Sequence, residues 1–252
     1  MAYIKNRHNV RLRFYSDLNL LLSRERRGVS FIRSLTEPAS VKDVIESCGV
    51  PHTEVDVILV NGEPEDFQYL VTGDEQISVY PVIHSIDIPA TDRLQNRELH
   101  DPRFVVDVNL GKLVRYLRLC GFDTAYRTNN SDKELINIML KEDRVLLTRD
   151  RKLLMHKVIR NGMLVYSDEP VDQLVEVMNR FELYTKTTPF SRCINCNGIL
   201  ELAEKADVID QLEPLTKRYF DRFSKCNQCG QVYWDGSHRK RLHPKLKKIL
   251  DL

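Results

Sequence analysis

The chain has 252 residues, of which 42% are hydrophobic and 29% charged, so it has the material for a folded core and does not resemble a disordered polymer. At roughly 150 residues per domain, two domains are expected rather than one. No window approaches the roughly 18 uncharged apolar residues of a membrane helix, and the N-terminus lacks the apolar core of a signal peptide. We therefore expect a cytoplasmic protein without a membrane partner.

The net charge of +2 is unevenly distributed. Residues 1–92 carry a net charge of −5, residues 93–190 carry +3, and residues 191–252 carry +4. A polyanion is therefore predicted to dock on the C-terminal two thirds of the chain, whereas the acidic first segment should attract it little.

Residues 1–88 are predicted to form two strands, a helix and further strands. The stretch VRLRFY alternates apolar and polar side chains, which is the period of a half-buried strand, and a second strand is expected over residues 28–34. Ser40 offers a helix N-cap, and Gly49 marks the end of that helix. The run VDVILV, the Asn61-Gly62 turn and the run ISVYPV then indicate further strands.

This order of elements, with the Asn-Gly turn followed by GDEQISVYPV, resembles a β-grasp domain (α+β) of the ubiquitin-like sulfur-carrier type over residues 8–86. Such carriers act through a free Gly-Gly carboxyl terminus. Here Pro81-Val82-Ile83 leads into more chain, so activation at that end is chemically excluded. The resemblance therefore implies an accessory or docking role, with a protein as a candidate partner of this domain.

Residues 89–102 are polar, contain prolines and show no sustained apolar period, so they are predicted to be a linker. Residues 103–187 are predicted to form an α/β domain with a mostly parallel sheet. The short apolar runs FVVDV, RVLLT and MLVYS are separated by stretches of helical period, as expected of strands buried on both faces. A weaker strand is expected over residues 122–127, and helices are expected to begin near Leu110, Ser131 and Pro170.

An aspartate closely follows or ends each of three strands in this segment. The carboxyl ends of strands in open α/β sheets line the crevice that binds ligands, so these side chains are expected to converge, together with Asp132 at a helix start. A cluster of carboxylates needs a cation to offset its repulsion, and oxygen ligands favour Mg²⁺ or Mn²⁺, which can activate water against a phosphodiester. The alternative is that each aspartate is a helix N-cap. The three aspartates are Asp107, Asp150 and Asp168.

The run FVVDVNLGKLVRYLRLCGFDTAYRTNNSDKELINIML, followed by RVLLTRDRKLL, resembles the C-terminal RNase domain family named after the Mut-seven exonuclease, a branch of the PIN-like nucleases. The resemblance extends over about residues 103–235. It implies that Asp107, Asp132 and Asp150 bind a catalytic Mg²⁺ or Mn²⁺. Asp168 and Asp172 compete for a fourth acidic position.

The same resemblance implies roles for the basic and polar residues around these carboxylates. Arg149 and Thr148 would hold phosphate or orient a ligand, and Lys112 and Arg118 would contact the RNA backbone. A β-grasp domain before this nuclease domain occurs in bacterial members of the family.

Residues 188–252 contain two C-x-x-C pairs, Cys193/Cys196 and Cys226/Cys229, separated by a gap of 29 residues. Two such pairs can present four thiolates tetrahedrally to Zn²⁺, which favours a zinc ribbon over redox chemistry. Because the gap is long, an inserted strand or helix must bring the halves together. Four thiolates leave no open position for substrate, so the zinc is predicted to be structural. Cys48 and Cys120 are expected to be small buried hydrophobes.

The tail HRKRLHPKLKKIL has six lysines and arginines between residues 238 and 248 and no acid. A solvated charged terminus and a phosphate-binding patch both fit this pattern. The candidate RNA contacts in the tail are Arg239, Lys240 and Arg241.

The leading hypothesis from the sequence is a divalent-metal-dependent ribonuclease with a β-grasp domain, a PIN-like α/β domain and a zinc ribbon. Arg149, Asp107, Asp132 and Asp150 are its predicted catalytic residues. The competing hypothesis is a non-catalytic RNA-binding or ribosome-associated adapter, in which the zinc ribbon and tail bind nucleic acid and the aspartates are structural.

Overall fold

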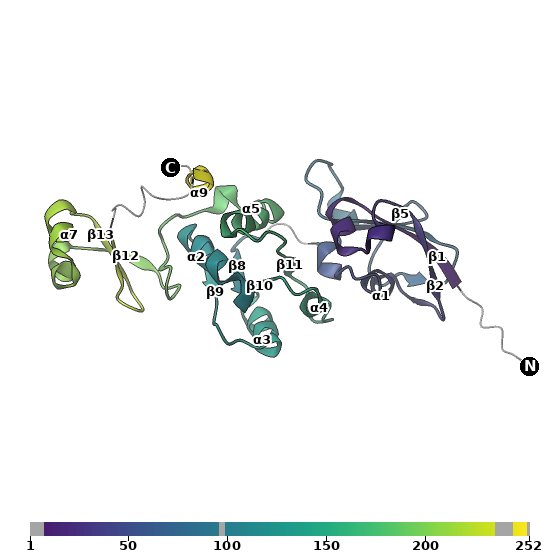
Figure 1. Ribbon diagram of the computed structural model, residues 1–252, viewed down its shortest axis with the longest axis horizontal. Coiled ribbons are helices and arrows are strands. Elements are labelled where there is room, and N and C mark those ends of the chain that lie inside the picture. Colours follow the sequence, from purple (N-terminus) through teal and green to yellow (C-terminus); the bar gives the residue numbers. More distant parts are fainter. Residues whose placement is uncertain (1–7, 96–98, 235–243, 251–252) are drawn as a thin grey trace, which may run out of the picture. The chain divides into compact units, whose positions relative to one another are not determined.

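The computed structural model describes residues 8–95, 99–234 and 244–250 (Figure 1). The chain divides into two compact units: unit 1 comprises Met1–Arg97 and Asp150–Leu164, and unit 2 comprises Glu98–Arg149 and Val165–Leu252. The expected fold class is confirmed by an N-terminal sheet, parallel strands later in the chain and a cysteine cluster consistent with a zinc ribbon. The domain boundaries expected at residues 88, 102 and 187 stay predictions.

A five-stranded sheet forms the centre of unit 1. Its strands lie in the order β2-β1-β7-β4-β5, with β1 and β7 parallel and the other neighbours antiparallel. The strands β3 and β6 form a separate two-stranded antiparallel sheet, and α1 directly follows β3 in the chain. The strands are β1 (His8–Phe14), β2 (Phe31–Leu35), β3 (Ala39–Ser40), β4 (Val57–Val60), β5 (Glu63–Glu65), β6 (Leu70–Val71) and β7 (Gln76–Tyr80).

Alternating side chains give this sheet a buried face and an outer face. In β1 the side chains of Val10, Leu12 and Phe14 are buried, and the side chains between them are exposed. Helix α1 (Val41–Glu46) begins at the predicted N-cap, where the Ser40 side chain accepts a hydrogen bond from the first turn. The buried side of α1 and the buried face of the sheet supply the apolar core of this part of unit 1.

Buried polar groups hold residues 150–164 within unit 1. The ring nitrogens of His52 lie 2.7 Å from Glu46 Oε1 and 2.7 Å from the Ile159 carbonyl oxygen. Both partners are acceptors, so a ring with a proton on each nitrogen satisfies both. Glu54 accepts a hydrogen bond of 2.8 Å from the Leu164 N–H. The segment contains α4 (Arg151–Leu154) and β11 (Gly162–Leu164).

Unit 2 contains β8 and β10, which two of the predicted apolar runs form, and β9, which corresponds to the weaker strand expected over residues 122–127. Strands β10, β8 and β9 are neighbours in that order and are parallel. The capping box at Ser131 and the proline in the first turn at Pro170 are confirmed as helix starts. The elements are β8 (Arg103–Val106), α2 (Gly111–Leu119), β9 (Asp123–Ala125), α3 (Asp132–Glu142), β10 (Val145–Thr148) and α5 (Pro170–Arg180).

The cysteine-rich end of unit 2 is a three-stranded antiparallel sheet in the order β12-β13-β14. Two helices occupy the gap between the cysteine pairs, as the length of that gap required, and Val208, Leu212, Phe223 and Val232 form their common core. Among the described residues, no helix has both the length and the apolar character needed to cross a membrane. The elements are β12 (Leu200–Ala203), α6 (Lys205–Val208), α7 (Pro214–Tyr219), β13 (Phe223–Cys226), β14 (Val232–Trp234) and α9 (Pro244–Ile249).

Replacing His52 with alanine is expected to loosen residues 159–164, because it removes both contacts of the buried ring. The free energy of unfolding should fall by about 1–3 kcal/mol. The backbone amides of residues 159–164 should also exchange hydrogen faster. Urea unfolding and hydrogen–deuterium exchange measure the two effects. His156→Ala is the matched control in the same segment, where the side chain is exposed. Unchanged exchange in His52→Ala would contradict the role given to this ring.

Candidate functional site

Asp107 lies at the carboxyl end of β8 and is only 7% exposed. Its Oδ1 accepts a hydrogen bond of 2.6 Å from the Val108 N–H, and its Oδ2 accepts one of 2.8 Å from the Thr148 hydroxyl. The parallel pairing of Val106 with Leu147 places the two strand ends side by side. The structure therefore brings together two of the predicted site residues, Asp107 and Thr148.

Arg149 and Asp168 form a second pair of predicted site residues in unit 2. Arg149 Nη1 lies 2.7 Å from Asp168 Oδ1. The loop that carries Asp168 is held from α5, because Glu176 accepts hydrogen bonds from the N–H groups of Tyr166 and Ser167 and from the Ser167 hydroxyl. Sequence reasoning did not find Glu176, and its position on a helical face gave no signal for this role.

Two further predicted residues of unit 2, Asp132 and Lys112, lie in the first turns of helices. Asp132 is the first residue of α3 and is exposed, directly after the capping residue Ser131. Lys112 is exposed in the first turn of α2, the helix that follows Asp107 and the short 3-10 helix Val108–Leu110. Both positions leave the charged group at the surface.

Asp150 belongs to unit 1, where it caps helix α4. Its Oδ1 accepts hydrogen bonds from the N–H groups of Lys152 (2.7 Å) and Leu153 (3.3 Å). Asp107 is likewise the N-cap of a 3-10 helix. The N-cap contacts that the sequence left open as an alternative are therefore present at two of the three predicted metal-binding aspartates.

The four cysteines are the group of metal-ligating side chains that the described residues bring together. Among the described residues, the one group of three or more His, Cys, Asp or Glu side chains that could hold a metal ion is formed by Cys193, Cys196, Cys226 and Cys229, whose ligand atoms all lie within 4.8 Å of one another. The carboxylates expected to cage Mg²⁺ or Mn²⁺ are not gathered in this way, and their metal site stays a prediction.

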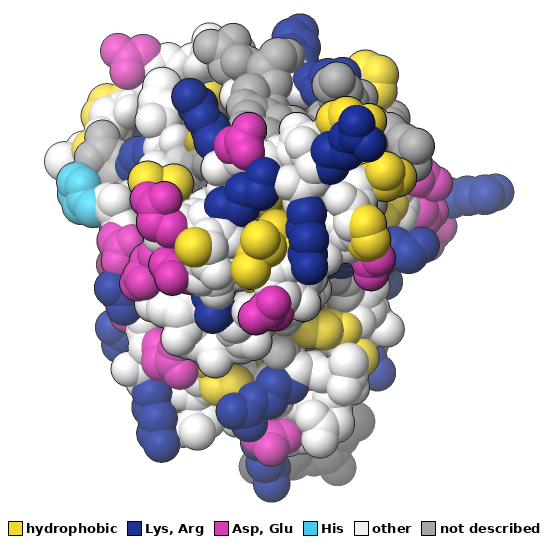
Figure 2. Space-filling model, turned by 90° about the vertical axis from the view of Figure 1, so that its left-hand side faces the viewer, with side chains coloured by type: hydrophobic (Ala, Val, Ile, Leu, Met, Phe, Trp, Pro, Cys, Tyr) yellow, Lys and Arg dark blue, Asp and Glu magenta, His cyan; other side chains and the backbone are white. Residues whose placement is uncertain are grey.

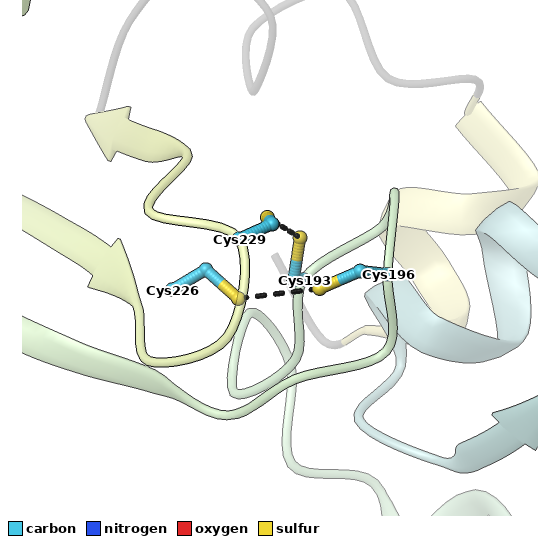
Figure 3. Close-up of side chains that lie close together, drawn as sticks. All are labelled: Cys193, Cys196, Cys226 and Cys229. Carbon is cyan, nitrogen blue, oxygen red and sulfur yellow. Dashed lines mark hydrogen bonds between the residues drawn. The ribbon is translucent and has the colours of Figure 1, made fainter.

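The geometry of the four cysteines fits Zn²⁺. Their side chains point toward one another from two loops (Figure 3), with sulfur–sulfur distances of 3.6 Å for Cys193–Cys229 and 3.4 Å for Cys196–Cys226. Tetrahedral Zn–S bonds of about 2.3 Å place sulfurs about 3.8 Å apart. Gly198 permits the close approach of the two loops, since a Cβ there would lie 2.7 Å from the Cys226 sulfur.

The ionisation of these thiols is unequal in the absence of a cation. Burial raises the pKa of Cys193, but hydrogen bonds from Tyr233 and from backbone N–H groups outweigh it and lower the pKa to about 6. The N–H of Gln231 lowers the pKa of Cys229, but burial and the neighbouring sulfurs outweigh it and raise the pKa to about 12. Four thiolates at this spacing repel one another, so a cation is needed for all of them to ionise.

Arg118 connects the first cysteine loop to the parallel strands of unit 2. It is 5% exposed and donates to the Thr124 carbonyl (2.9 and 3.2 Å), the Ile194 carbonyl (3.1 Å) and the Asn195 carbonyl (2.7 Å). Burial lowers the pKa of Arg118, and the nearby cysteine sulfurs act in the opposite direction. The contacts present are structural, and the RNA contact expected of Arg118 stays a prediction.

Asp123 makes a second connection, which the sequence did not predict although the residue lies within the run that resembles the RNase domain family. Its carboxylate accepts hydrogen bonds from Arg144 (2.7 Å) and from the Asn197 side chain (2.8 Å). Burial raises the pKa of Asp123, but these two bonds outweigh it and hold the pKa below its usual value. A strand end and a cysteine loop are thereby joined through one carboxylate.

The predicted RNA contacts Arg239, Lys240 and Arg241 lie outside the described residues. The described part of the tail is helix α9, from which Lys245 forms an ion pair of 2.5 Å with Asp172 of α5. Figure 2 faces the end of the chain that carries β12, β13 and α7, and shows basic, acidic and hydrophobic side chains interleaved there. That view shows both charge signs side by side rather than a basic surface.

Comparison with known families gives two matches. A model described as Mut7-C RNAse domain matches residues 102–246, which is more than half of the chain. A model described as Mut7-C ubiquitin matches residues 7–87. The search found no significant match to a curated protein or to a solved structure.

Replacing Cys226 with serine is expected to reduce bound zinc from about one ion per chain to near zero, because three thiolates hold the ion far less tightly than four. Metal analysis of the purified protein measures the zinc content, and thermal unfolding should shift to lower temperature. Cys48→Ser is the matched control, since Cys48 is not among the four clustered cysteines. A full complement of zinc in Cys226→Ser would disprove the four-cysteine assignment.

Asp123→Asn is expected to lower the free energy of unfolding by about 1–3 kcal/mol near pH 7. Because the folded-state pKa of Asp123 is depressed, its contribution is fully present above about pH 3.9, the usual aspartate value, and is lost as pH falls through the folded-state pKa. The difference between wild type and variant should therefore shrink toward pH 3. Urea unfolding followed by Trp234 fluorescence measures it, with the exposed Asp210→Asn as control. A difference independent of pH would refute the ion pair as its source.

Proposed function

The chain belongs to the Mut7-C RNAse domain family, and from this premise we propose that it hydrolyses RNA phosphodiester bonds in a Mg²⁺- or Mn²⁺-dependent reaction. The domain that carries the activity would be of the PIN-like type. The four-cysteine site would hold a structural zinc ion and take no part in the chemistry.

The observation that carries this proposal is Asp107. Its carboxylate is 7% exposed and lies at the carboxyl end of a parallel strand. Open α/β sheets bind their ligands at these strand ends. Each of its oxygens accepts one hydrogen bond, from Val108 N–H or from the Thr148 hydroxyl, and each keeps a lone pair. The two bonds fix the orientation of the carboxylate and leave it able to accept a further ligand.

Asp107, Asp132 and Asp150 are the residues that would hold the cation, since carboxylate oxygens are the ligands that Mg²⁺ and Mn²⁺ prefer. When bound, the cation supplies activation of water and stabilisation of the leaving oxygen. Arg149, positioned by Asp168, would offset charge on the phosphate, and exposed Lys112 would contact the backbone of the RNA.

A second candidate function is a non-catalytic RNA-binding adapter. It is favoured by the N-cap contacts of Asp107 and Asp150, which give both side chains a structural use. It predicts RNA binding without metal-dependent turnover.

Asp107→Asn is expected to lower RNA cleavage at least about a hundredfold, because the amide cannot supply a charged oxygen to the cation. Labelled single-stranded and hairpin RNAs, incubated with Mn²⁺, with Mg²⁺ or without either, are followed on denaturing gels. Circular dichroism and zinc content should stay at wild-type levels.

Asp143→Asn is the matched control, because Asp143 precedes β10 whereas Asp107 lies at the opposite, carboxyl end of the neighbouring parallel strand. Asparagine also tolerates the positive φ of 48° at this position. Cleavage by Asp107→Asn at the wild-type rate would discard the site. RNA binding by the wild-type protein without turnover in any metal would favour the adapter.

A further inference from the structure

Charge is segregated within the acidic first part of the chain. From His8 to Leu35 the sequence has six arginines and two acidic residues, whereas residues 36–92 have one lysine and twelve acidic residues. Three of these arginines, Arg11, Arg13 and Arg33, lie in the strands β1 and β2, which contain no acidic residue and are therefore a basic part of unit 1.

The outer face of the sheet carries no carboxylate at the described positions of β1, β2, β4 and β7. The register places Arg11 between Ile32 and Gln76, and Arg13 beside Ser78. Ser78 in turn faces Leu59. The residues of this face, which we call the outer sheet face, are Asn9, Arg11, Arg13, Tyr15, Ile32, Ser34, Val57, Leu59, Gln76, Ser78 and Tyr80.

Two tyrosines form an aromatic platform on the outer sheet face. The rings of Tyr15 and Tyr80 are stacked, with centroids 4.2 Å apart and an interplanar angle of 12°. The guanidinium of Arg13 lies 5.1 Å from the centroid of the Tyr15 ring. Both rings are half-buried, so the platform is preorganised, and stacking a base on it would cost little side-chain entropy.

Arg11 and Arg13 are exposed beside this platform, and among the described residues neither forms an ion pair. Two uncompensated guanidinium groups next to stacked rings match a single-stranded nucleic acid, whose phosphates take the charge and whose bases stack. The outer sheet face has one exposed large hydrophobic side chain among its described residues, Ile32, and its neighbours are polar. It therefore lacks the apolar centre of a typical protein–protein interface.

We propose that the outer sheet face of the β-grasp part binds single-stranded RNA, with bases stacked at Tyr15 and Tyr80 and phosphates contacted by Arg11 and Arg13. The residues of this site are different from the carboxylates of the proposed hydrolysis. Stacking accepts every base, so binding at this face has little sequence preference.

The test uses the full chain and a fluorescein-labelled oligouridine of about twelve nucleotides, without added Mg²⁺ or Mn²⁺, so that binding is read apart from cleavage. Fluorescence anisotropy measures the affinity at several salt concentrations. Arg11→Ser with Arg13→Ser should weaken binding about tenfold. It should also reduce the slope of log affinity against log salt by about 1.4, since each lost phosphate contact in a single strand removes about 0.7.

Arg24→Ser with Lys42→Ser is the matched control, because it removes the same charge from unit 1 outside the strands of the sheet. It should leave affinity and salt slope near the wild-type values. Tyr80→Leu should weaken binding about tenfold through lost stacking, whereas Tyr80→Phe keeps the ring and should retain most of the affinity.

Ultraviolet cross-linking of an oligonucleotide that contains 4-thiouridine locates the contact, and the linked peptides should include Tyr15 or Tyr80. Equal affinities for the Arg11→Ser/Arg13→Ser variant and the control variant would overturn the proposal. Cross-links confined to residues of unit 2 would also overturn it, and the outer sheet face would then be expected to bind another class of partner. These binding results stand whether or not Asp107→Asn loses cleavage, so the two proposals fail separately.

Discussion

A single guanidinium satisfies carbonyl groups from two parts of unit 2. Arg118 lies at the end of α2, and its donors reach the carbonyls of Thr124 in the parallel strand β9 and of Asn195 between the first two cysteines. Carbonyls that lose such a partner in a buried position cost free energy, so the position of the cysteine loop relative to the strands depends on this side chain. Asp123 repeats the connection with the opposite charge, through Asn197 of the same loop. The four-cysteine cluster and the parallel strands are thus linked parts of one folded unit.

The N-cap and metal-ligand interpretations of the aspartates are compatible in chemical terms. A carboxylate oxygen has two lone pairs, and one hydrogen bond from an N–H uses one of them. At Asp107 the bonds from Val108 and Thr148 also orient the group, which is what a preformed cation site requires. The capping contacts therefore give the carboxylates the structural use that the adapter hypothesis requires, but they do not weaken the ability of the carboxylate to bind a cation.

Local patterns predicted the elements well. The helix starts at Ser40, Ser131 and Pro170 and the parallel run of β8 and β10 follow from short-range spacing. The roles of Glu54, Asp123 and Glu176 could not be predicted from short-range spacing. Each side chain accepts hydrogen bonds from groups that are far away in the chain or across a turn, and a sequence has no periodic signal for such contacts. The four cysteines could be identified because each pair has a short, recognisable spacing. The three aspartates are widely separated and have no such spacing, so their convergence stays a prediction.

Net charge misleads about the N-terminal segment, residues 1–92, for a physical reason. Its sum of −5 over residues 1–92 counts charges on all sides of the sheet equally, but salt screens a surface charge beyond about 8–10 Å. A bound nucleic acid therefore interacts mainly with the charged groups within that distance. Strand alternation directs Arg11 and Arg13 outward and turns Arg33, paired with Val10, to the opposite face. Because strand alternation, and not the net charge, decides which charges share a face, an acidic segment can present one face whose only charged residues are arginines, and the proposed RNA site lies on that face.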